Sequence, residues 1–262
     1  MNKRIVDILK TDPPKEISVS GWVRSFRGNR FISLNDGSCL ASLQVVIDSD
    51  KFPQELISNL NNGASILATG RLISSQGSGQ SVELQAEEIK IYGKSSQEEL
   101  QKTILQPKRH SLEKLREQGH LRIRTNLFGA VFRIRHHMAY AINKYFNDNG
   151  FFYIHTPIIT GTDAEGAGET FRVTTLPVGE KNNDNSKDFF GKPTHLTVSG
   201  QLEAELAALA LGKVYTFGPT FRAENSNTTR HLAEFWMVEP EIAFADINDN
   251  INLGEKFLKY LI

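Results

Sequence analysis

The residues best equipped for chemistry lie in a predicted hairpin near the end of the chain. Segments 221–224 and 235–238 are predicted to be short strands, and the polar residues 225–231 between them are typical of a turn. Because alternate residues of a strand point to one side, Arg222 and Glu224 are expected to share a face. Arginine binds phosphate, a carboxylate accepts a hydrogen bond from an amine, and an aromatic ring stacks on a purine. The hairpin therefore suits ATP, and a cross-strand ion pair is the alternative interpretation.

The stretch FRAENSNTTRHLAEFW, which begins at Phe221, resembles motif 2 of the class II aminoacyl-tRNA synthetases. Its form is most similar to the asparaginyl-tRNA synthetases, and the match has no gaps. The resemblance implies a set of ATP-binding residues: Arg222 at the α-phosphate, Glu224 at the adenine amine, Phe235 stacked on adenine, and Arg230 or His231 near the γ-phosphate. It also implies that the loop 225–229 meets the acceptor end of the tRNA.

The composition is typical of a soluble globular protein, with 39% hydrophobic and 23% charged residues. The length of 262 residues suggests about two domains. Thirty Lys and Arg balance thirty Asp and Glu, so an RNA-binding surface would have to come from local clustering. The single cysteine, Cys39, excludes an intrachain disulfide and argues against a structural zinc site, and no metal ligand is predicted among the 262 residues. Because no run of about 18 apolar residues and no signal peptide is present, we expect a cytoplasmic protein without a membrane partner.

The first domain is predicted to span residues 1–100 and to be all-β. It contains five strand-like runs: 17–25, 30–34, 40–47, 64–72 and 82–91. A helical segment near 53–60 separates the third run from the fourth, and this order predicts a five-stranded OB-type barrel. Such barrels bind single-stranded nucleic acid on aromatic rings within a basic groove. Trp22, Phe26 and Phe31, which alternate with arginines, are candidates for that surface, although strand alternation must send some of them into the core.

The stretch GWVRSFRGNRFISLNDG, followed by LASLQVV, resembles the anticodon-binding barrel of the aspartyl-, asparaginyl- and lysyl-tRNA synthetases. The resemblance implies that Arg27, Phe31 and Gln44 read the anticodon, and that the RNA partner is tRNA(Asn). Trp22 is assigned to the barrel core.

A linker is predicted at residues 101–125. Its basic residues either form a solvated surface or, by the resemblance, lie near the tRNA. The second domain, residues 126–262, begins with an amphipathic helix that Thr125 caps and Gly150 ends. The apolar stripe of this helix is expected to face the core: Leu127, Val131, Ile134, Met138 and Ile142.

Three further segments resemble parts of the class II synthetases. The stretch GFFYIHTP is similar to motif 1, which implies a strand that ends at Pro157 and a homodimer interface there. A small acidic loop at 163–169 implies that Glu165 meets the α-ammonium group of the amino acid, and an acidic surface turn is the alternative. The stretch LTVSGQ implies that Gln201 hydrogen-bonds the bound amino acid.

A helix is predicted at 202–211, with Leu206 and Leu209 facing inward. The aspartyl enzymes carry a lysine for the substrate carboxylate at the position of Ala204, and a neutral amide needs no such cation. The resemblance implies instead that Glu205 accepts a hydrogen bond from the side-chain amide of asparagine. A glutamate alone on a helix would otherwise be solvent-exposed.

The expected architecture is a mixed α+β and all-β two-domain chain, in which an OB-fold barrel precedes an incomplete class II antiparallel sheet with flanking helices. The resemblance implies an asparagine–tRNA ligase that uses ATP and Mg²⁺. No glycine-rich third motif precedes the final predicted helix, 253–262, so we expect the metal ligands beyond residue 262 and an inactive 262-residue chain. Two alternatives are an aspartyl-type or asparagine-forming relative, against which Ala204 argues, and a noncatalytic RNA-binding paralogue.

Overall fold

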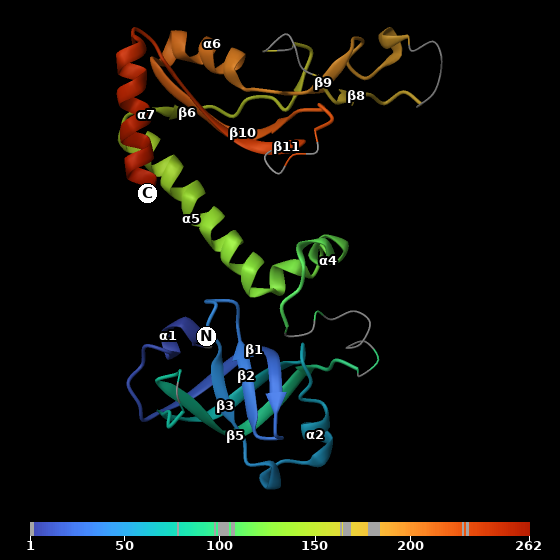
Figure 1. Ribbon diagram of the computed structural model, residues 1–262, viewed down its shortest axis with the longest axis vertical. Helices are drawn as coiled ribbons and strands as arrows, with labels where there is room; N and C mark the ends of the chain where they lie inside the picture. Colours follow the sequence, from blue (N-terminus) through green and yellow to red (C-terminus); the bar gives the residue numbers. More distant parts are fainter. Residues whose placement is uncertain are drawn as a thin grey trace. The chain divides into compact units, whose positions relative to one another are not determined.

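The computed structural model describes residues 3–77, 79–96, 98, 105, 108–162, 164, 169–177, 184–226, 228 and 231–262. The chain divides into two compact units, Met1–Arg135 and His136–Ile262. The boundary falls within the long helix α5 (Asn126–Asp148), and each unit is described by itself (Figure 1).

The first unit is built on a closed barrel with the strand order β1-β2-β3-β5-β4. Its strands are β1 (Lys15–Arg27), β2 (Phe31–Asn35), β3 (Leu43–Val46), β4 (Ser65–Ser74) and β5 (Val82–Gly93). Strands β3 and β5 pair in parallel, whereas the other neighbours are antiparallel. Short helices complete the unit: α1 (Ile5–Ile8), η1 (Ser49–Lys51), α2 (Gln54–Ser58), α4 (Leu112–Glu117) and η2 (Arg122–Arg124). The predicted five-stranded barrel is confirmed.

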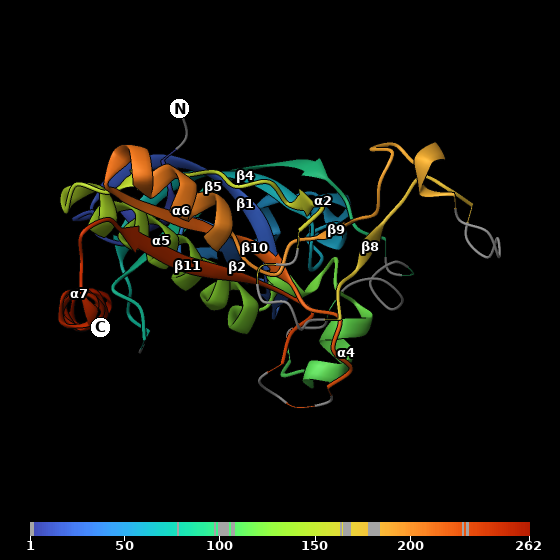
Figure 2. The same ribbon diagram turned by 90° about the horizontal axis from the view of Figure 1, so that it is seen from above.

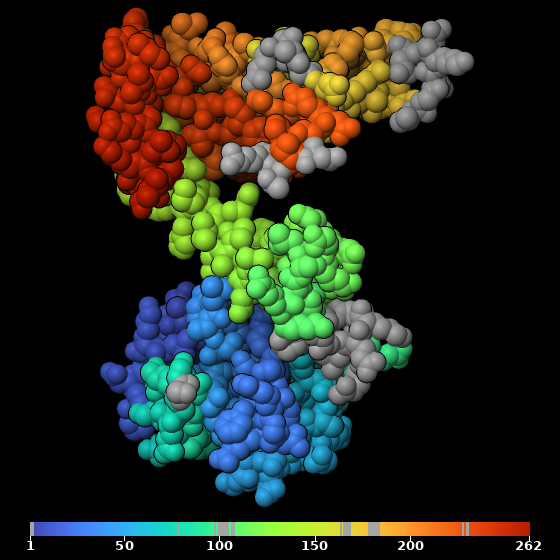
Figure 3. Space-filling model, in the orientation of Figure 1, coloured from blue at the N-terminus to red at the C-terminus, as the bar shows by residue number. Residues whose placement is uncertain are grey.

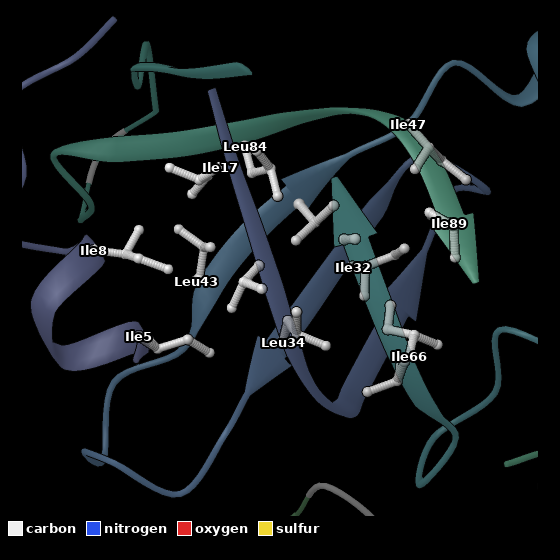
Figure 4. Packing of buried hydrophobic residues seen from close by; sticks show 14 of the residues in the cluster. Ile5, Ile8, Ile17, Ile32, Leu34, Leu43, Ile47, Ile66, Leu84 and Ile89 are labelled. Atoms are coloured by element: carbon white, nitrogen blue, oxygen red, sulfur yellow. The ribbon is translucent and has the colours of Figure 1, made fainter. Parts of the chain in front are cut away.

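Apolar side chains on the inward side of each strand fill the barrel (Figure 4). Ile32 and Leu34 alternate with outward residues along β2, and both are fully buried. Helix α1 closes the barrel with Ile5 and Ile8, and the Ile5 amide donates to Asp36 Oδ2 at 2.8 Å. Figure 3 shows one face of this unit in a space-filling view.

The assignment of Trp22 to the core is wrong. Its side chain is 52% exposed, whereas its neighbours Gly21 and Val23 are buried. Successive residues of β1 point to opposite sides, so burying Val23 turns the indole outward.

The second unit contains two small sheets. The larger has the order β11-β10-β6 and is formed by β6 (Phe152–Tyr153), β10 (Lys213–Phe221) and β11 (Glu234–Ile242). The smaller has the order β7-β9-β8 and is formed by β7 (Ile159–Thr160), β8 (Arg172–Val173) and β9 (Thr194–Leu196). The helices are the end of α5, η3 (Asn185–Lys187), α6 (Gln201–Leu211) and α7 (Ile247–Leu261). The predicted sheet with flanking helices is confirmed, although β6 pairs with β10 in parallel, whereas β10 and β11 are antiparallel as expected.

Each face of the larger sheet has its own helices. Tyr215 points to one face and stacks on Phe146 of α5, with ring centroids 4.6 Å apart, in a cluster that α7 completes through Phe257. Its neighbour Val214 points to the opposite face and packs against α6, which lies along β10 and β11 (Figures 1 and 2). We call the face that α6 covers the site face.

Helix α6 contacts the sheet through small residues. Ala204 and Ala208, four positions apart, are buried against Val214. Leu206 and Leu209 are 70% and 85% exposed, so the prediction that they face inward is wrong. The small alanine side chains allow the helix to lie close to the strand. Because the alanine side of α6 faces the sheet, the leucines on its other side face outward.

The other helix predictions have mixed outcomes. Thr125 caps α5, because its Oγ1 accepts from the Phe128 amide at 3.3 Å, and Gly150 ends it with a φ of +80°. The predicted core stripe of α5 is wrong over its first half, since three of its members are exposed: Leu127, Val131 and Ile134. Helix α7 begins earlier than predicted because Asp246 and Asp249 form a capping box. No helix in the described ranges has an apolar stretch long enough to cross a membrane.

Candidate functional site

The predicted hairpin exists, but its first strand lies earlier than expected. Strand β10 ends at Phe221, so Arg222 and Glu224 follow the strand instead of sharing one of its faces. Gly218 and Pro219, which are uncommon inside strands, both lie within β10. The two chains stay paired for one further step, because the Arg222 amide donates to the Ala233 carbonyl at 3.1 Å.

The structure brings two of the predicted ATP-binding side chains together. The guanidinium carbon of Arg222 lies 5.6 Å from the ring centroid of Phe235, within the range of a cation–π interaction. Phe235 pairs with Thr220 across the hairpin. A cation for phosphate and a flat ring for a base are therefore neighbours at one end of the site face.

The other predicted ATP residues are more dispersed. Glu224 is exposed, and His231 is exposed and hydrogen-bonded to Thr228 through Nδ1. Arg230 lies outside the described residues, as do two positions of the loop 225–229.

Two of the predicted amino-acid-binding residues form a pair on the first turn of α6. Gln201 Nε2 donates to Glu205 Oε1 at 2.8 Å, and both side chains are exposed. Ala204 is fully buried on the side of α6 that contacts the sheet. Glu165 lies outside the described residues.

Glu239 of β11, to which the sequence assigned no role, holds this part of the site together. Its carboxylate accepts from Thr216 Oγ1 at 2.9 Å, from the Gly200 amide at 3.2 Å, and from Ser199 Oγ. Gly200 caps α6, so Glu239 fixes the start of the helix that carries Gln201. A side chain at Gly200 would not fit, since a Cβ there would lie 2.6 Å from Thr156 Oγ1. Strand alternation is the sequence signal that could have predicted this position. Phe235, Met237 and Glu239 are alternate residues of β11, so all three point to the site face.

A further carboxylate makes the site face acidic. Burial raises the pKa of Glu241, and the nearby charges of Glu205 and Glu239 raise it further. Glu205 comes from α6 and the other two come from β11, so tertiary packing gathers their charges. Such a negative region attracts an ammonium group.

A cavity of about 270 Å³ lies beside Glu239. Its walls come from the segment after β6 and from the two strands, and include His155, Thr156, Thr216 and Trp236. Of the ATP- and amino-acid-binding residues predicted within the described ranges, none lines this cavity. Pro157, the predicted dimer contact, is exposed in irregular backbone four residues after β6, so the predicted longer strand that ends at this proline is wrong.

The predicted anticodon residues share the outer surface of the barrel in the first unit. Arg27 and Phe31 lie directly opposite each other on β1 and β2. Gln44 pairs with Ser33, two residues along β2 on the same side, and its amide donates to Glu83 Oε2 at 3.1 Å. Phe31 is 38% exposed, and the Arg30 guanidinium carbon lies 5.5 Å from its ring centroid. A partly open ring with arginines beside it is suited to stacking on a base.

Within the described residues, no group of three or more His, Cys, Asp or Glu side chains has a geometry that would hold a metal ion. The site face therefore offers a cation, an aromatic ring, an amide and carboxylates as its chemical groups.

Comparison with known families matches both units. Residues 17–92 match the OB-fold nucleic acid binding domain, and residues 111–262 match the class II tRNA synthetases of the D, K and N group. The chain belongs to this class II tRNA synthetase family. Curated relatives include the asparagine–tRNA ligases of Parabacteroides distasonis, 57% identical over 99% of this chain, and of a Nostoc species, 54% identical over 100% of it.

A solved structure gives the same fold. The asparaginyl-tRNA synthetase of Pyrococcus horikoshii, complexed with asparaginyl-adenylate, superposes on all of this chain with a TM-score of 0.83 and 25% identity. The chain spans 57% of that structure and 57% and 58% of the two curated relatives. This class II synthetase chain therefore corresponds to a little over half of each of these proteins.

Proposed function

We propose that the protein to which this chain belongs attaches asparagine to tRNA(Asn) through an asparaginyl-adenylate. The observation that carries the proposal is the site face, where the Arg222 guanidinium lies over Phe235 and Glu239 anchors the start of α6. The relatives that are named asparagine–tRNA ligases, at 54–57% identity, support the choice of amino acid.

In the first step the asparagine carboxylate attacks the α-phosphorus of ATP. A P–O bond forms to the carboxylate, the bond to the β,γ-phosphates breaks, and pyrophosphate leaves with the electron pair. Arg222 stabilises the negative charge that develops on the α-phosphate, and Phe235 stacks on the adenine. Glu224, Arg230 and His231 are proposed contacts of the adenine amine and the γ-phosphate. No protein nucleophile is needed, because positioning and charge stabilisation supply the catalysis.

The amino acid is held by the start of α6. The acidic region of Glu205, Glu239 and Glu241 attracts the α-ammonium group, to which we also assign Glu165. Gln201 hydrogen-bonds the amino acid, and Glu205 accepts from its side-chain amide. A free aspartate carboxylate would meet the charge of Glu205, so the site favours asparagine.

In the second step a ribose hydroxyl at the tRNA terminus attacks the adenylate carbonyl, and AMP leaves. The loop 225–229 is the proposed contact of the acceptor end, and Arg27, Phe31 and Gln44 read the anticodon. Mg²⁺, when bound, would neutralise phosphate charge, and none of the residues named above is proposed as its ligand. The protein is proposed to act as a homodimer in the cytoplasm, with Pro157 at the subunit interface.

The test is ATP–pyrophosphate exchange by the complete protein with asparagine or aspartate. Asparagine should support exchange, and Arg222→Ala should lower it by roughly two to three orders of magnitude, the usual effect of losing one preorganised donor. Arg135→Ala, which removes an exposed arginine of α5, is the matched control and should leave exchange unchanged. Exchange that depends on aspartate would support the aspartyl-type alternative, and near-normal exchange by Arg222→Ala would reject the phosphate assignment.

A further inference from the structure

Three arginines gather where α5 begins beside the barrel of the first unit, and we call Arg24, Arg124 and Arg133 the arginine cluster. Arg24 Nη1 donates to the Arg124 carbonyl at 2.8 Å, across 100 residues of sequence. Arg133 donates to the Gly37 carbonyl at 2.5 Å and to the Gly129 carbonyl at 2.9 Å. All of these contacts lie within the first unit.

A break in strand pairing directs the side chain of Arg24 toward the start of α5. The register of β1 against β2 shifts between Val23 and Ser25, so Arg24 is left out of the ladder. Such a bulge turns a side chain away from the direction that regular alternation would give it. The side chain of Arg24 therefore reaches η2 and the start of α5.

The arginine cluster is positively charged without a balancing carboxylate. Within the described residues, no ion pair joins any of its three guanidinium groups to Asp or Glu, although exposed ion pairs occur elsewhere in the unit. Burial lowers the pKa of Arg24, and the charges of Arg124 and Arg133 lower it further. A guanidinium has five N–H donors, and Arg24 uses one and Arg133 two in these backbone contacts. The remaining donors can serve an anion, which would also relieve the mutual repulsion.

An aromatic ring lies next to the arginine cluster. The indole of Trp22 reaches Gly37, where a Cβ would lie 3.9 Å from Trp22 Cζ3, and Gly37 is the residue whose carbonyl Arg133 binds. Trp22 is half exposed, as shown above. A guanidinium group beside an open aromatic ring is the combination that holds a nucleic-acid strand, by phosphate contact and by stacking.

We propose that the arginine cluster binds a backbone phosphate of the tRNA, with Trp22 packing against the adjacent nucleotide. The inference rests on the proposed function, in which the barrel binds tRNA. Arg24 is three residues from Arg27 on β1, or about 10 Å along the strand. An RNA strand that meets Arg27 and Phe31 can therefore continue over the arginine cluster. The contact is to phosphate, so it does not depend on the anticodon sequence.

The test measures binding of the 262-residue chain to two fluorescent tRNA transcripts, one with the asparagine anticodon and one with a changed anticodon, by anisotropy from 50 to 200 mM salt. The decisive variant is Arg124→Gln, because the side chain of Arg124 is exposed and makes no hydrogen bond among the described residues. It should weaken binding of both transcripts by the same factor, about three- to tenfold, and lower the salt slope by about one. Arg24→Gln should do the same if its melting temperature matches that of the wild type.

The matched control is Arg71→Gln. Arg71 is exposed on β4, opposite Glu16 of β1. Ser65, six residues earlier on β4, is the residue that pairs with Trp22, so Arg71 lies about 20 Å along the strand from the Trp22 position. It should leave affinity and salt slope at wild-type values.

Each of the following outcomes overturns the inference. Unchanged affinity and slope for Arg124→Gln would mean that the arginine cluster only braces the fold, and a loss confined to the asparagine transcript would mean that it reads sequence. A change in sedimentation mass with RNA affinity unchanged would make it a protein contact. If the wild-type chain prefers the asparagine transcript in these cases, tRNA recognition by the barrel stands. If it binds neither transcript at low salt, that part of the proposed function falls together with the inference.

Discussion

Two carboxylates on the same strand should respond in opposite ways to the same substitution. Glu239 and Glu241 both point to the site face of β11, two residues apart. The carboxylate of Glu239 accepts three hydrogen bonds, whereas Glu241 accepts none among the described residues and has a raised pKa. Replacing each by glutamine removes one negative charge and keeps the shape of the side chain.

Glu239→Gln should destabilise the second unit. The amide oxygen of glutamine can keep one or two of the three donors, and its NH2 group then faces the others. Leaving the Gly200 amide poorly paired costs about 1–3 kcal/mol, so a loss of about 2 kcal/mol is expected. With a urea dependence of about 2 kcal/mol per molar, the unfolding midpoint falls by about 1 M.

Glu241→Gln should leave stability at pH 7 unchanged or raise it. A carboxyl whose folded pKa is raised binds more protons when folded than when unfolded between the two pKa values. The free energy of unfolding of the wild type therefore falls as the pH rises through that interval. Glutamine does not titrate, so the variant should lack this fall.

The assay is urea unfolding followed by tryptophan fluorescence at several pH values from 4.5 to 7.5. The chain has two tryptophans, so a Trp22→Phe background leaves Trp236 as a reporter of the second unit alone. Equal midpoints for Glu239→Gln and the wild type would refute the anchoring role of Glu239. A loss of stability in Glu241→Gln at pH 7 would refute the account of its environment.

Three further predictions follow from the same geometry. Phe235→Ala should raise the KM for ATP in the exchange assay by the equivalent of about 1–3 kcal/mol, because a stacking surface is lost; an unchanged KM would place adenine elsewhere. Glu205→Gln should lower the ratio of asparagine to aspartate activation, since charge repulsion against aspartate disappears, and an unaltered ratio would assign discrimination to another residue. Asp188 accepts from Thr174 Oγ1 and from two backbone amides, which hold its pKa well below the ordinary value. The carboxylate of Asp188 stabilises the fold above the ordinary carboxyl pKa, and this stabilisation is lost as the pH falls through the lower folded value. Asp188→Asn should therefore lower the urea midpoint at pH 7, and the difference in midpoint from the wild type should narrow toward pH 2. A difference in midpoint that stays constant with pH would contradict this.

The local features of the chain were predictable from its sequence. The five barrel strands follow from alternating apolar residues and turn residues, and each strand lies within a few positions of its predicted range. Arg27, Phe31 and Gln44 share one surface because strand pairing puts opposite residues on the same side. The motif that contains Arg222 and Phe235 pointed to their shared site, although not to the end of β10 at Phe221.

Tertiary packing decided the features that depend on which side of an element meets its neighbour. The sequence shows that α6 is rich in apolar residues, but not which of them face the sheet. The close approach of Ala204 to β10 decides that Leu206 faces outward.

The same holds for the polar contacts that shape the sites. Ser199 and Glu239 are 40 residues apart in sequence, and Arg24 and Arg124 are 100 apart, so no local pattern joins them. Each pair forms because the fold brings together two segments whose sequences separately predict only a strand or a helix end. The sequence by itself therefore determined the elements and their chemical groups, whereas long-range contacts decided which of those groups meet.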